Sequence, residues 1–206
     1  AYSELDPKLV DALHLAKDRI LEFHSAYLPK SWMDFSKGYG LIIKPVNRVG
    51  VYIPANLSST VLMTVIPAKV AGVNEIIVTT PSKSNGTPNP AVLVAADIAG
   101  ADRVFSVGGA QAIAAMSFGT QTIPKVDMIC GPGNIFVTLA KKMVFGEVGV
   151  DGLYGPTETV IIADEHANPT LCATDLLAQS EHDVMATPIL ITTSQGIADI
   201  VQKEVK

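Results

Sequence analysis

The chain has 206 residues, of which 48% are hydrophobic, and a formal net charge of −5. Because a nucleic-acid surface needs clustered Lys and Arg, an acidic chain without a basic cluster argues against a nucleic-acid partner. No apolar run approaches the roughly 20 residues that span a bilayer, and the start is too charged for a signal peptide. Cys130 and Cys172 lie far apart in apolar segments and indicate free thiols in a reducing compartment. We therefore expect a soluble, cytoplasmic protein without a membrane partner.

The N-terminal segment predicts one long helix followed by two strands. Apolar residues recur at helical spacing from Asp6 to about Leu28, where Pro29 ends the pattern. The next apolar stretch, GLIIKPVNRVGVYIP, is interrupted by Pro45 and Gly50, which is typical of two short strands rather than one helix.

Short apolar strands then alternate with helices. The expected strands are Val49–Ile53, Glu75–Thr79, Arg103–Val107 and Val126–Cys130, and the expected helices are Ser59–Ala71, Pro90–Ala99, Ala110–Phe118 and Asn134–Phe145. A smaller set follows, with strand Thr159–Ala163, helix Pro169–Glu181, strand Pro188–Thr192 and a last helix after Gln195. This alternation predicts an α/β fold of parallel sheets flanked by helices on both faces. The Gly-rich joint near residues 149–156 is the expected domain boundary.

Three loops that follow predicted strands could bind a ligand. Gly131–Asn134 joins a strand to a helix start, where N–H groups are free to meet an anion. Gln111 stands in the first turn of another helix, and Tyr52 ends a strand. A tight turn, a surface amide and a half-buried core ring are the respective alternatives. Together, three such loops at one sheet edge favour a nucleotide-type ligand.

Gln179 and His182 are the candidate metal ligands. They are three residues apart on a predicted helix, so their side chains share one face and could hold one ion. Imidazole is a good zinc ligand, whereas an amide oxygen is an unusual one. The alternative is a helix end that carries a dipole-stabilised His. Since zinc takes three or four ligands, at least one more would come from elsewhere.

Two further features suggest chemistry but have simpler interpretations. Glu165 and His166 look like a carboxylate–imidazole pair, but adjacent residues point apart and the segment is typical of a solvated loop. Cys130 could be a nucleophile only with a lowered pKa or a nearby base, and a buried apolar thiol is the simpler interpretation.

An ordered series of short motifs resembles the histidinol dehydrogenase family. The series is VGVYIP, STVLM, IPAKVAGV, VGGAQAIAA, FGT, IPKVD, GPGN, GPTE, IADEHANP and DLLAQSEHD. The resemblance implies an aldehyde dehydrogenase-like fold with incomplete Rossmann-type domains, a catalytic zinc, and homodimers whose sites take residues from both chains. It also implies oxidation of L-histidinol, an amino alcohol, through an aldehyde to histidine, with reduction of two NAD.

The resemblance assigns roles to individual residues. It implies that NAD contacts Tyr52, Gln111 and Asn134, that Gln179 and His182 bind zinc and substrate, and that Thr157 contacts the substrate. The family usually has Ser at the place of Thr157, and Ala55-Asn56 replaces a longer loop with paired glycines. Both departures leave open another alcohol as substrate.

The resemblance also predicts three parts of the chain. Residues 1–50 would pack on the substrate domain, residues 51–155 would form the NAD-binding domain, and residues 156–206 would begin the substrate and zinc domain. The family's Glu-His base pair and remaining zinc ligands lie beyond the matched region. The last expected helix reaches Lys206 without a cap, so we expect a partial site, inactive alone. A short non-catalytic paralogue that binds nucleotide or metal is the alternative.

Overall fold

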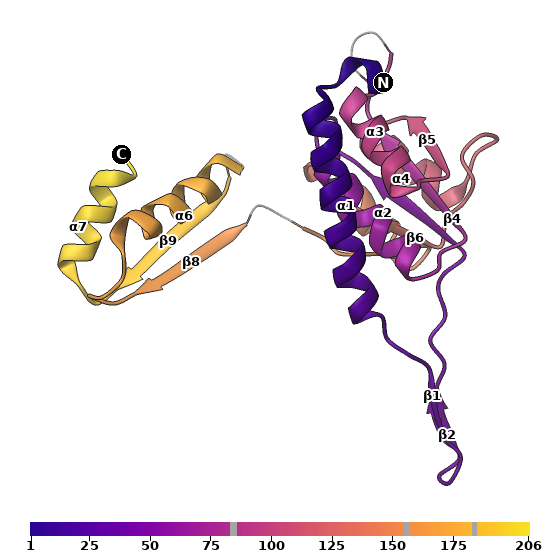
Figure 1. Ribbon diagram of the computed structural model, residues 1–206, viewed down its shortest axis with the longest axis horizontal. Helices are drawn as coiled ribbons and strands as arrows, with labels where there is room; N and C mark the ends of the chain where they lie inside the picture. Colours follow the sequence, from indigo (N-terminus) through magenta and orange to yellow (C-terminus); the bar gives the residue numbers. More distant parts are fainter. Residues whose placement is uncertain (83–85, 155–156, 183–184) are drawn as a thin grey trace. The chain divides into compact units, whose positions relative to one another are not determined.

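A computed structural model describes residues 1–82, 86–154, 157–182 and 185–206, with His182 described by its backbone alone. The chain forms two compact units, residues 1–154 and 155–206. Each unit is α/β, with parallel strands and flanking helices (Figure 1), so the expected fold class is confirmed.

A five-stranded parallel sheet organises the first unit. Its strands are β3 (Arg48–Tyr52), β4 (Glu75–Thr80), β5 (Arg103–Ser106), β6 (Met128–Cys130) and β7 (Gly149–Val150). Their spatial order is β5-β4-β3-β6-β7, and every neighbouring pair is parallel. β3 is therefore the central strand, and β6 joins it only after β4 and β5 have been added on the other side.

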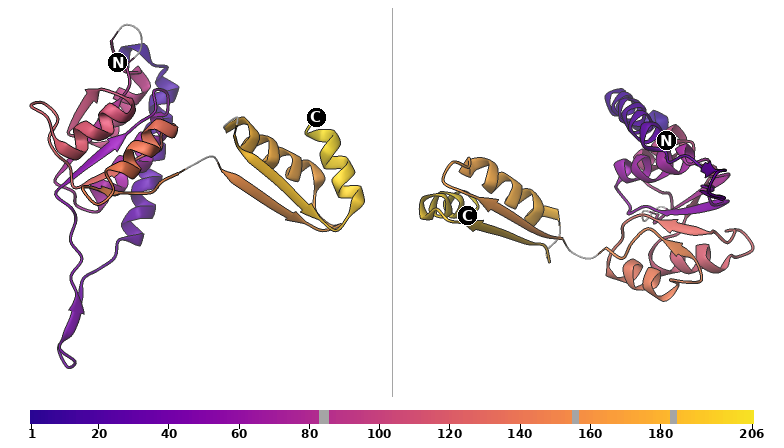
Figure 2. Two further views of the ribbon diagram at one scale, coloured as in Figure 1. Left: turned by 180° about the vertical axis from the view of Figure 1, so that it is seen from behind. Right: turned by 90° about the horizontal axis from the view of Figure 1, so that it is seen from below.

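Helices cover both faces of this sheet. They are α2 (Ser58–Val70), α3 (Pro90–Ala99), α4 (Gly109–Phe118) and α5 (Ile135–Met143), and α1 (Pro7–Tyr27, preceded by the 3-10 turn Tyr2–Glu4) packs on α2 and α3. Along β4, Ile76 and Val78 face one apolar cluster with side chains of α2 and α3, whereas Ile77 faces another with α4. This alternation is the period of two expected for a strand buried on both sides. The two helical layers are visible in Figure 2.

The N-terminal helix belongs to this first unit. The Asp6 carboxylate accepts a hydrogen bond from the Lys8 N–H at the start of α1, and Pro7 occupies the first helical position. Leu13 is buried in the cluster formed with α2 and α3. Packing of residues 1–50 on the second domain stays a prediction, and the contacts of α1 described here are with its own unit.

A hairpin follows α1 that the sequence patterns did not predict in full. β1 (Trp32–Asp34) pairs antiparallel with β2 (Tyr39–Leu41), and the Trp32 ring meets the Tyr39 ring edge-on. Both rings are exposed. Because the hairpin lacks a buried face, β1 carries no alternation of buried and exposed residues that would have indicated a strand.

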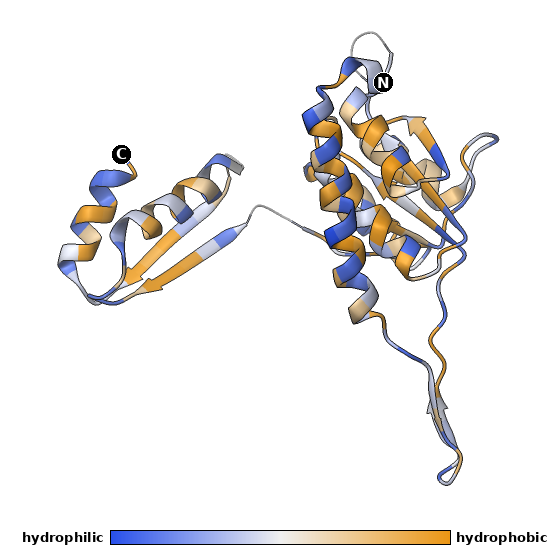
Figure 3. Cartoon of the chain, in the orientation of Figure 1, coloured by the Kyte–Doolittle hydropathy of each residue, from blue (hydrophilic) through white to orange (hydrophobic). Residues whose placement is uncertain are grey.

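The second unit contains a two-stranded parallel sheet and two helices. β8 (Glu158–Ala163) pairs with β9 (Thr187–Thr192), and α6 (Pro169–His182) and α7 (Gln195–Glu204) pack on one face of the pair. Figure 3 shows that both strands are rich in hydrophobic residues. The opposite face exposes four apolar side chains, Val160, Ile162, Ile189 and Ile191.

Candidate functional site

The carboxyl ends of the strands form the candidate binding edge of the first unit. From β3 the chain moves outward to β4 and β5 and then returns to place β6 and β7 on the opposite side of β3. Ligands of open parallel sheets bind where the strand order reverses in this way, because the helices after the two central strands lie on opposite faces and leave a crevice. The loops after β3 and β6 border this position.

Tyr52 ends β3 and is almost buried, with 5% of its surface exposed. Its ring belongs to the apolar cluster beneath α4, and its hydroxyl oxygen accepts a hydrogen bond of 3.2 Å from the Gly109 N–H. The ring therefore packs as a core residue while its polar end reaches the loop that precedes α4. This contact links two of the three loops that the sequence singled out.

Gln111 is exposed in the first turn of α4, and its side chain turns back toward Gly109. A Cβ atom on Gly109 would stand 2.8 Å from Gln111 Oε1, and Gly109 has a φ of +68°. Tyr52 and Gln111 thus lie on either side of the same glycine. The structure brings these two sequence-predicted residues together without a direct hydrogen bond between them among the described contacts.

Gly131 lies close against the backbone at the end of β3. A Cβ atom here would lie 2.1 Å from the Tyr52 carbonyl oxygen, and the φ angle is +113°. A side chain is therefore excluded both by space and by backbone conformation. The close approach joins the end of β6 to the end of β3, directly at the reversal of strand order.

Asn134 is the N-cap of α5 rather than its first helical residue. Its side-chain oxygen accepts hydrogen bonds of 3.1 Å from the N–H groups of Phe136 and Val137. Capping uses two of the four N–H groups that a helix leaves free at its start. The loop runs from the buried Gly131 to the exposed Asn134, and it therefore ends at a helix start that retains N–H groups for an anionic ligand.

The loop after β3 is anchored to the start of α3. The Asn89 side-chain amide donates a hydrogen bond of 3.1 Å to Asn56 Oδ1, and Asn89 also caps α3. The Ala55-Asn56 segment is thus held at the same sheet edge as Tyr52.

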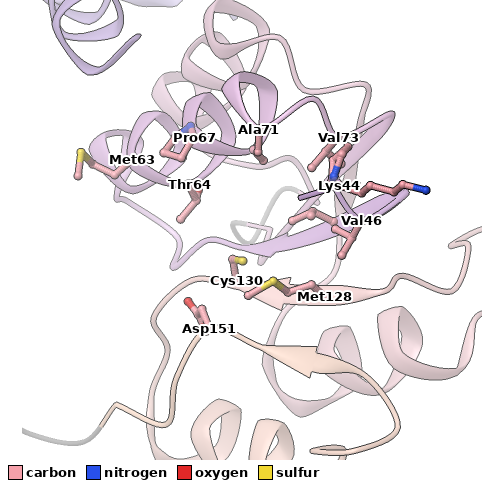
Figure 4. A pocket seen from close by; sticks show the side chains of 13 residues that line it. Lys44, Val46, Met63, Thr64, Pro67, Ala71, Val73, Met128, Cys130 and Asp151 are labelled. Carbon is pink, nitrogen blue, oxygen red and sulfur yellow. The ribbon is translucent and has the colours of Figure 1, made fainter. Parts of the chain in front are cut away.

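A hollow of about 420 Å³ runs beside α2 and the strands β3 and β6. Figure 4 shows Met63, Thr64 and Pro67 on its helical wall and Met128 and Cys130 on its strand wall. Burial, together with the nearby Asp151 carboxylate, raises the pKa of the Cys130 thiol to about 11, while the Lys141 charge opposes the shift. The thiol is consequently protonated near neutral pH, as a non-nucleophilic packing residue would be.

Lys141 and Asp151 are residues of this edge to which the sequence assigned no role. The Gly131 N–H donates a hydrogen bond of 2.8 Å to Asp151 Oδ2, and Lys141 forms an ion pair with the same carboxylate. The sequence did hold one sign that Lys141 is buried, because it comes four residues after Val137 and so shares the inward face of the short amphipathic helix α5.

The candidate metal ligand Gln179 lies in the second unit, half-exposed on α6. It lines a shallow hollow with Thr159, Ile161, Asp175 and Ala178. His182 is the last residue of α6, and its side chain lies outside the described part of the chain. Among the described residues, no group of three or more His, Cys, Asp or Glu side chains could hold a metal ion.

Thr157, the candidate substrate contact, is exposed just before β8. Its carbonyl oxygen accepts a hydrogen bond of 3.2 Å from the Thr187 N–H, which fixes its backbone to the start of β9. The preceding Gly and Pro of the GPTE motif lie outside the described residues.

Glu165 and His166 lie in a turn before α6, with 65% and 83% of their side chains exposed. The expected solvated loop is confirmed. The expectation that the two side chains point apart is wrong, because Glu165 Oε1 and His166 Nε2 are 3.8 Å apart. Free rotation at the surface lets neighbouring side chains meet without forming a site.

Comparison with known proteins covers the whole chain. The family model described as histidinol dehydrogenase matches residues 1–206. A histidinol dehydrogenase of Synechococcus sp. is 53% identical over 212 residues, which are 100% of this chain and 49% of that protein. One of Dehalococcoides mccartyi is 53% identical over 203 residues, covering 97% of this chain and 47% of the relative. The chain thus spans about half the length of the curated relatives it matches.

Solved structures agree with these matches. The crystal structure of histidinol dehydrogenase from Elizabethkingia anophelis is 37% identical, with a TM-score of 0.93 over 99% of this chain and 49% of that one. An NADP-dependent glyceraldehyde-3-phosphate dehydrogenase from Bacillus halodurans, solved with NADP, is 15% identical, with a TM-score of 0.50 over 96% of this chain and 51% of that one. The second likeness concerns the fold alone. Separately, none of the described helices is both long enough and apolar enough to cross a membrane.

Proposed function

Because the chain belongs to the histidinol dehydrogenase family, we propose that it forms part of an enzyme that oxidises L-histidinol through an aldehyde to L-histidine with reduction of two NAD. The observation that carries the proposal is the meeting of three loops at the reversal of strand order. Tyr52 contacts the loop before α4, and Gly131 packs on the Tyr52 carbonyl. A nucleotide cofactor is the ligand class that such sheet edges bind.

In this proposal Tyr52, Gln111 and Asn134 border the NAD site. Tyr52 holds the Gly109 loop, which keeps Gln111 at the sheet edge with its amide exposed. Asn134 fixes the start of α5, so that the remaining N–H groups of its first turn can meet the negatively charged pyrophosphate. The work of these residues is to bind and orient the cofactor, which brings a substrate alcohol into line for hydride transfer.

The second unit would supply part of the metal and substrate contacts. Gln179 and His182 are proposed as two zinc ligands that also contact substrate, and Thr157 as a substrate contact. An amide and an imidazole are two donors, fewer than zinc requires, so these residues fit only half of a shell. Zinc, when bound, would act as a Lewis acid that orients the amino alcohol. The remaining ligands and the Glu-His base pair would come from outside this chain.

NAD binding to the 206-residue chain tests the cofactor site directly. Titration calorimetry should show saturable binding of NAD that weakens at least 10-fold in Asn134→Ala. The matched control is Asp6→Ala, which removes the side-chain cap of α1 and leaves the three loops of the binding edge intact. Equal affinity of all three proteins, or no binding to the unaltered chain, would contradict the proposed site.

The substrate is tested in the longer protein to which this chain would contribute. NADH formation with L-histidinol should be lost on chelation and restored by zinc, and His182→Ala should lower the measured zinc content. Oxidation of other alcohols but not of L-histidinol would favour the family relative with a different substrate, which Thr157 and the Ala55-Asn56 loop suggest. NAD binding without oxidation of any alcohol would favour a non-catalytic role. A homodimer and a cytoplasmic location are further parts of the proposal, tested by light scattering and fractionation.

A further inference from the structure

Lys141 is a buried charged residue on the inner face of α5. Its side chain is 3% exposed, and it lies one turn after Val137, which is fully buried on the same face. A charged group in such a position is unfavourable unless ionic and hydrogen-bonding partners compensate for the lost water. The partners of Lys141 therefore indicate why α5 carries a lysine where an apolar side chain would pack.

Lys141 and its partner Asp151 both bind Gly131, the first residue of the loop after β6. Lys141 Nζ donates a hydrogen bond of 3.0 Å to the Gly131 carbonyl oxygen and forms an ion pair with Asp151 Oδ1. The other carboxylate oxygen, Asp151 Oδ2, accepts a hydrogen bond of 2.8 Å from the Gly131 N–H. The pair thus binds both backbone polar groups of Gly131, the residue at which a Cβ atom would collide with the Tyr52 carbonyl oxygen.

The same pair is tied to the segment that follows β7. Asp151 Oδ1 accepts a hydrogen bond of 2.8 Å from the Gly152 N–H, and the Lys141 ammonium lies 5.5 Å from the centre of the Tyr154 ring. Thr138, on α5, donates a hydrogen bond of 3.0 Å to the Tyr154 carbonyl oxygen. These contacts hold α5 to the segment that follows β7.

We propose that Lys141 and Asp151 are positioning residues that fix the Gly131–Asn134 loop in the conformation that receives the cofactor. The inference rests on the proposed NAD site and adds to it the pair that holds the loop. Neither side chain needs to touch NAD. Gly131 is clamped at one end of the loop and the Asn134 cap fixes the other, so the Gly133 N–H between them is ordered before the ligand arrives, which favours binding.

Two variants of the 206-residue chain separate positioning from general stability. Lys141→Met leaves the Asp151 charge without its partner, whereas Lys141→Met with Asp151→Leu replaces the pair by apolar side chains of similar size. Replacement of a buried ion pair in this way often restores stability. Neither apolar side chain can hold Gly131, so NAD affinity should stay at least 10-fold weaker in the double variant even if its melting temperature recovers.

Hydrogen exchange of the ligand-free chain gives a second, independent readout. The amides of residue 131 and of residues 133–137 should exchange at least 10-fold faster in both variants, while those of α4 keep their rates. The control is Lys125→Met, which removes the exposed Lys125–Glu147 pair, with side chains 51% and 49% exposed, and should change neither readout.

Each outcome decides between the two proposals. Recovery of NAD affinity together with stability in the double variant would overturn the positioning role, as would unchanged exchange in the loop. A third outcome is possible, in which the unaltered chain does not bind NAD but the variants still show faster exchange in the loop. That outcome would overturn the proposed cofactor site, and the Lys141–Asp151 pair would then only hold the loop.

Discussion

Replacing Gly131 by alanine perturbs a close contact between β3 and the loop that follows β6. The added Cβ would stand 2.1 Å from the Tyr52 carbonyl oxygen, about 1.3 Å inside ordinary contact distance. The obstacle is backbone, not the end of a flexible side chain, so β3 and the loop must separate. The φ of +113° adds a second cost, because L-residues avoid that region.

The expected size of the effect follows from these two costs. Positive φ costs an L-residue roughly 1–2 kcal/mol, overpacking adds roughly 1–3 kcal/mol, and the stiffer unfolded chain returns about 0.4–1 kcal/mol. We therefore expect Gly131→Ala to lower the free energy of unfolding of the first unit by about 1–5 kcal/mol. For a unit of this size, the melting temperature should fall by roughly 2–20 °C.

Gly146 provides the matched control. It also has positive φ, +95°, but a Cβ there would meet nothing within 4 Å. Gly146→Ala should therefore cost only the backbone strain, less than about 1.5 kcal/mol. Scanning calorimetry of both variants, with NAD titration of each, measures the difference. Equal melting temperatures, or normal NAD affinity in Gly131→Ala, would refute the argument that close approach of β3 and the loop builds the site.

Other variants test particular contacts of the described structure. Thr80→Val should raise stability in urea unfolding by up to about 1 kcal/mol, because Thr80 Oγ1 is a buried oxygen without a partner among the described residues. Thr79→Val should lower stability, because Thr79 Oγ1 donates a hydrogen bond to the Val51 carbonyl oxygen. Asn134→Ala and Asn89→Ala should each cost about 1 kcal/mol as lost caps. Iodoacetamide at pH 8 should label Cys130 roughly 100-fold more slowly than an ordinary thiol, because its pKa is raised to about 11. The pKa of Cys130 is higher in the folded than in the unfolded chain, so the contribution of this thiol to stability should be constant below pH 9 and fall as pH rises from about 9 to 11. Unfolding measured at each pH checks this dependence.

The elements with buried faces could be predicted from the sequence. The strands β3 and β4 were each expected within one residue of their observed bounds, because a strand buried on both sides is a short apolar run between loop residues. The edge strand β5 was also expected within one residue, although its side chains are mostly exposed. β7, with two residues, carries too little pattern to be detected. The hairpin strand β1 was missed because its side chains are mostly exposed and leave no period of burial.

The candidate site could be predicted at the level of loops but not of contacts. Gly131 and Asn134 were singled out because glycine and a capping residue between a strand and a helix mark a binding turn. Nothing in the sequence shows that Asp151 and Lys141 reach Gly131, because contacts between segments depend on the order of strands in space. The order β3 beside β6 brings them together, and that order is not a local property of the chain.

The strand order also determines when each edge of β3 can pair during synthesis of the chain. β3 can pair with β4 soon after both leave the ribosome, but its other edge waits for β6, in which Met128 pairs with Val49 across a separation of 79 residues. At translation rates of roughly 5–20 residues per second, that edge stays unpaired for about 4–16 s. An open central edge is a template for wrong strand pairing. The nascent chain is thus most exposed to aggregation while residues 53–127 are being made, and slower translation through this stretch would lengthen the exposure.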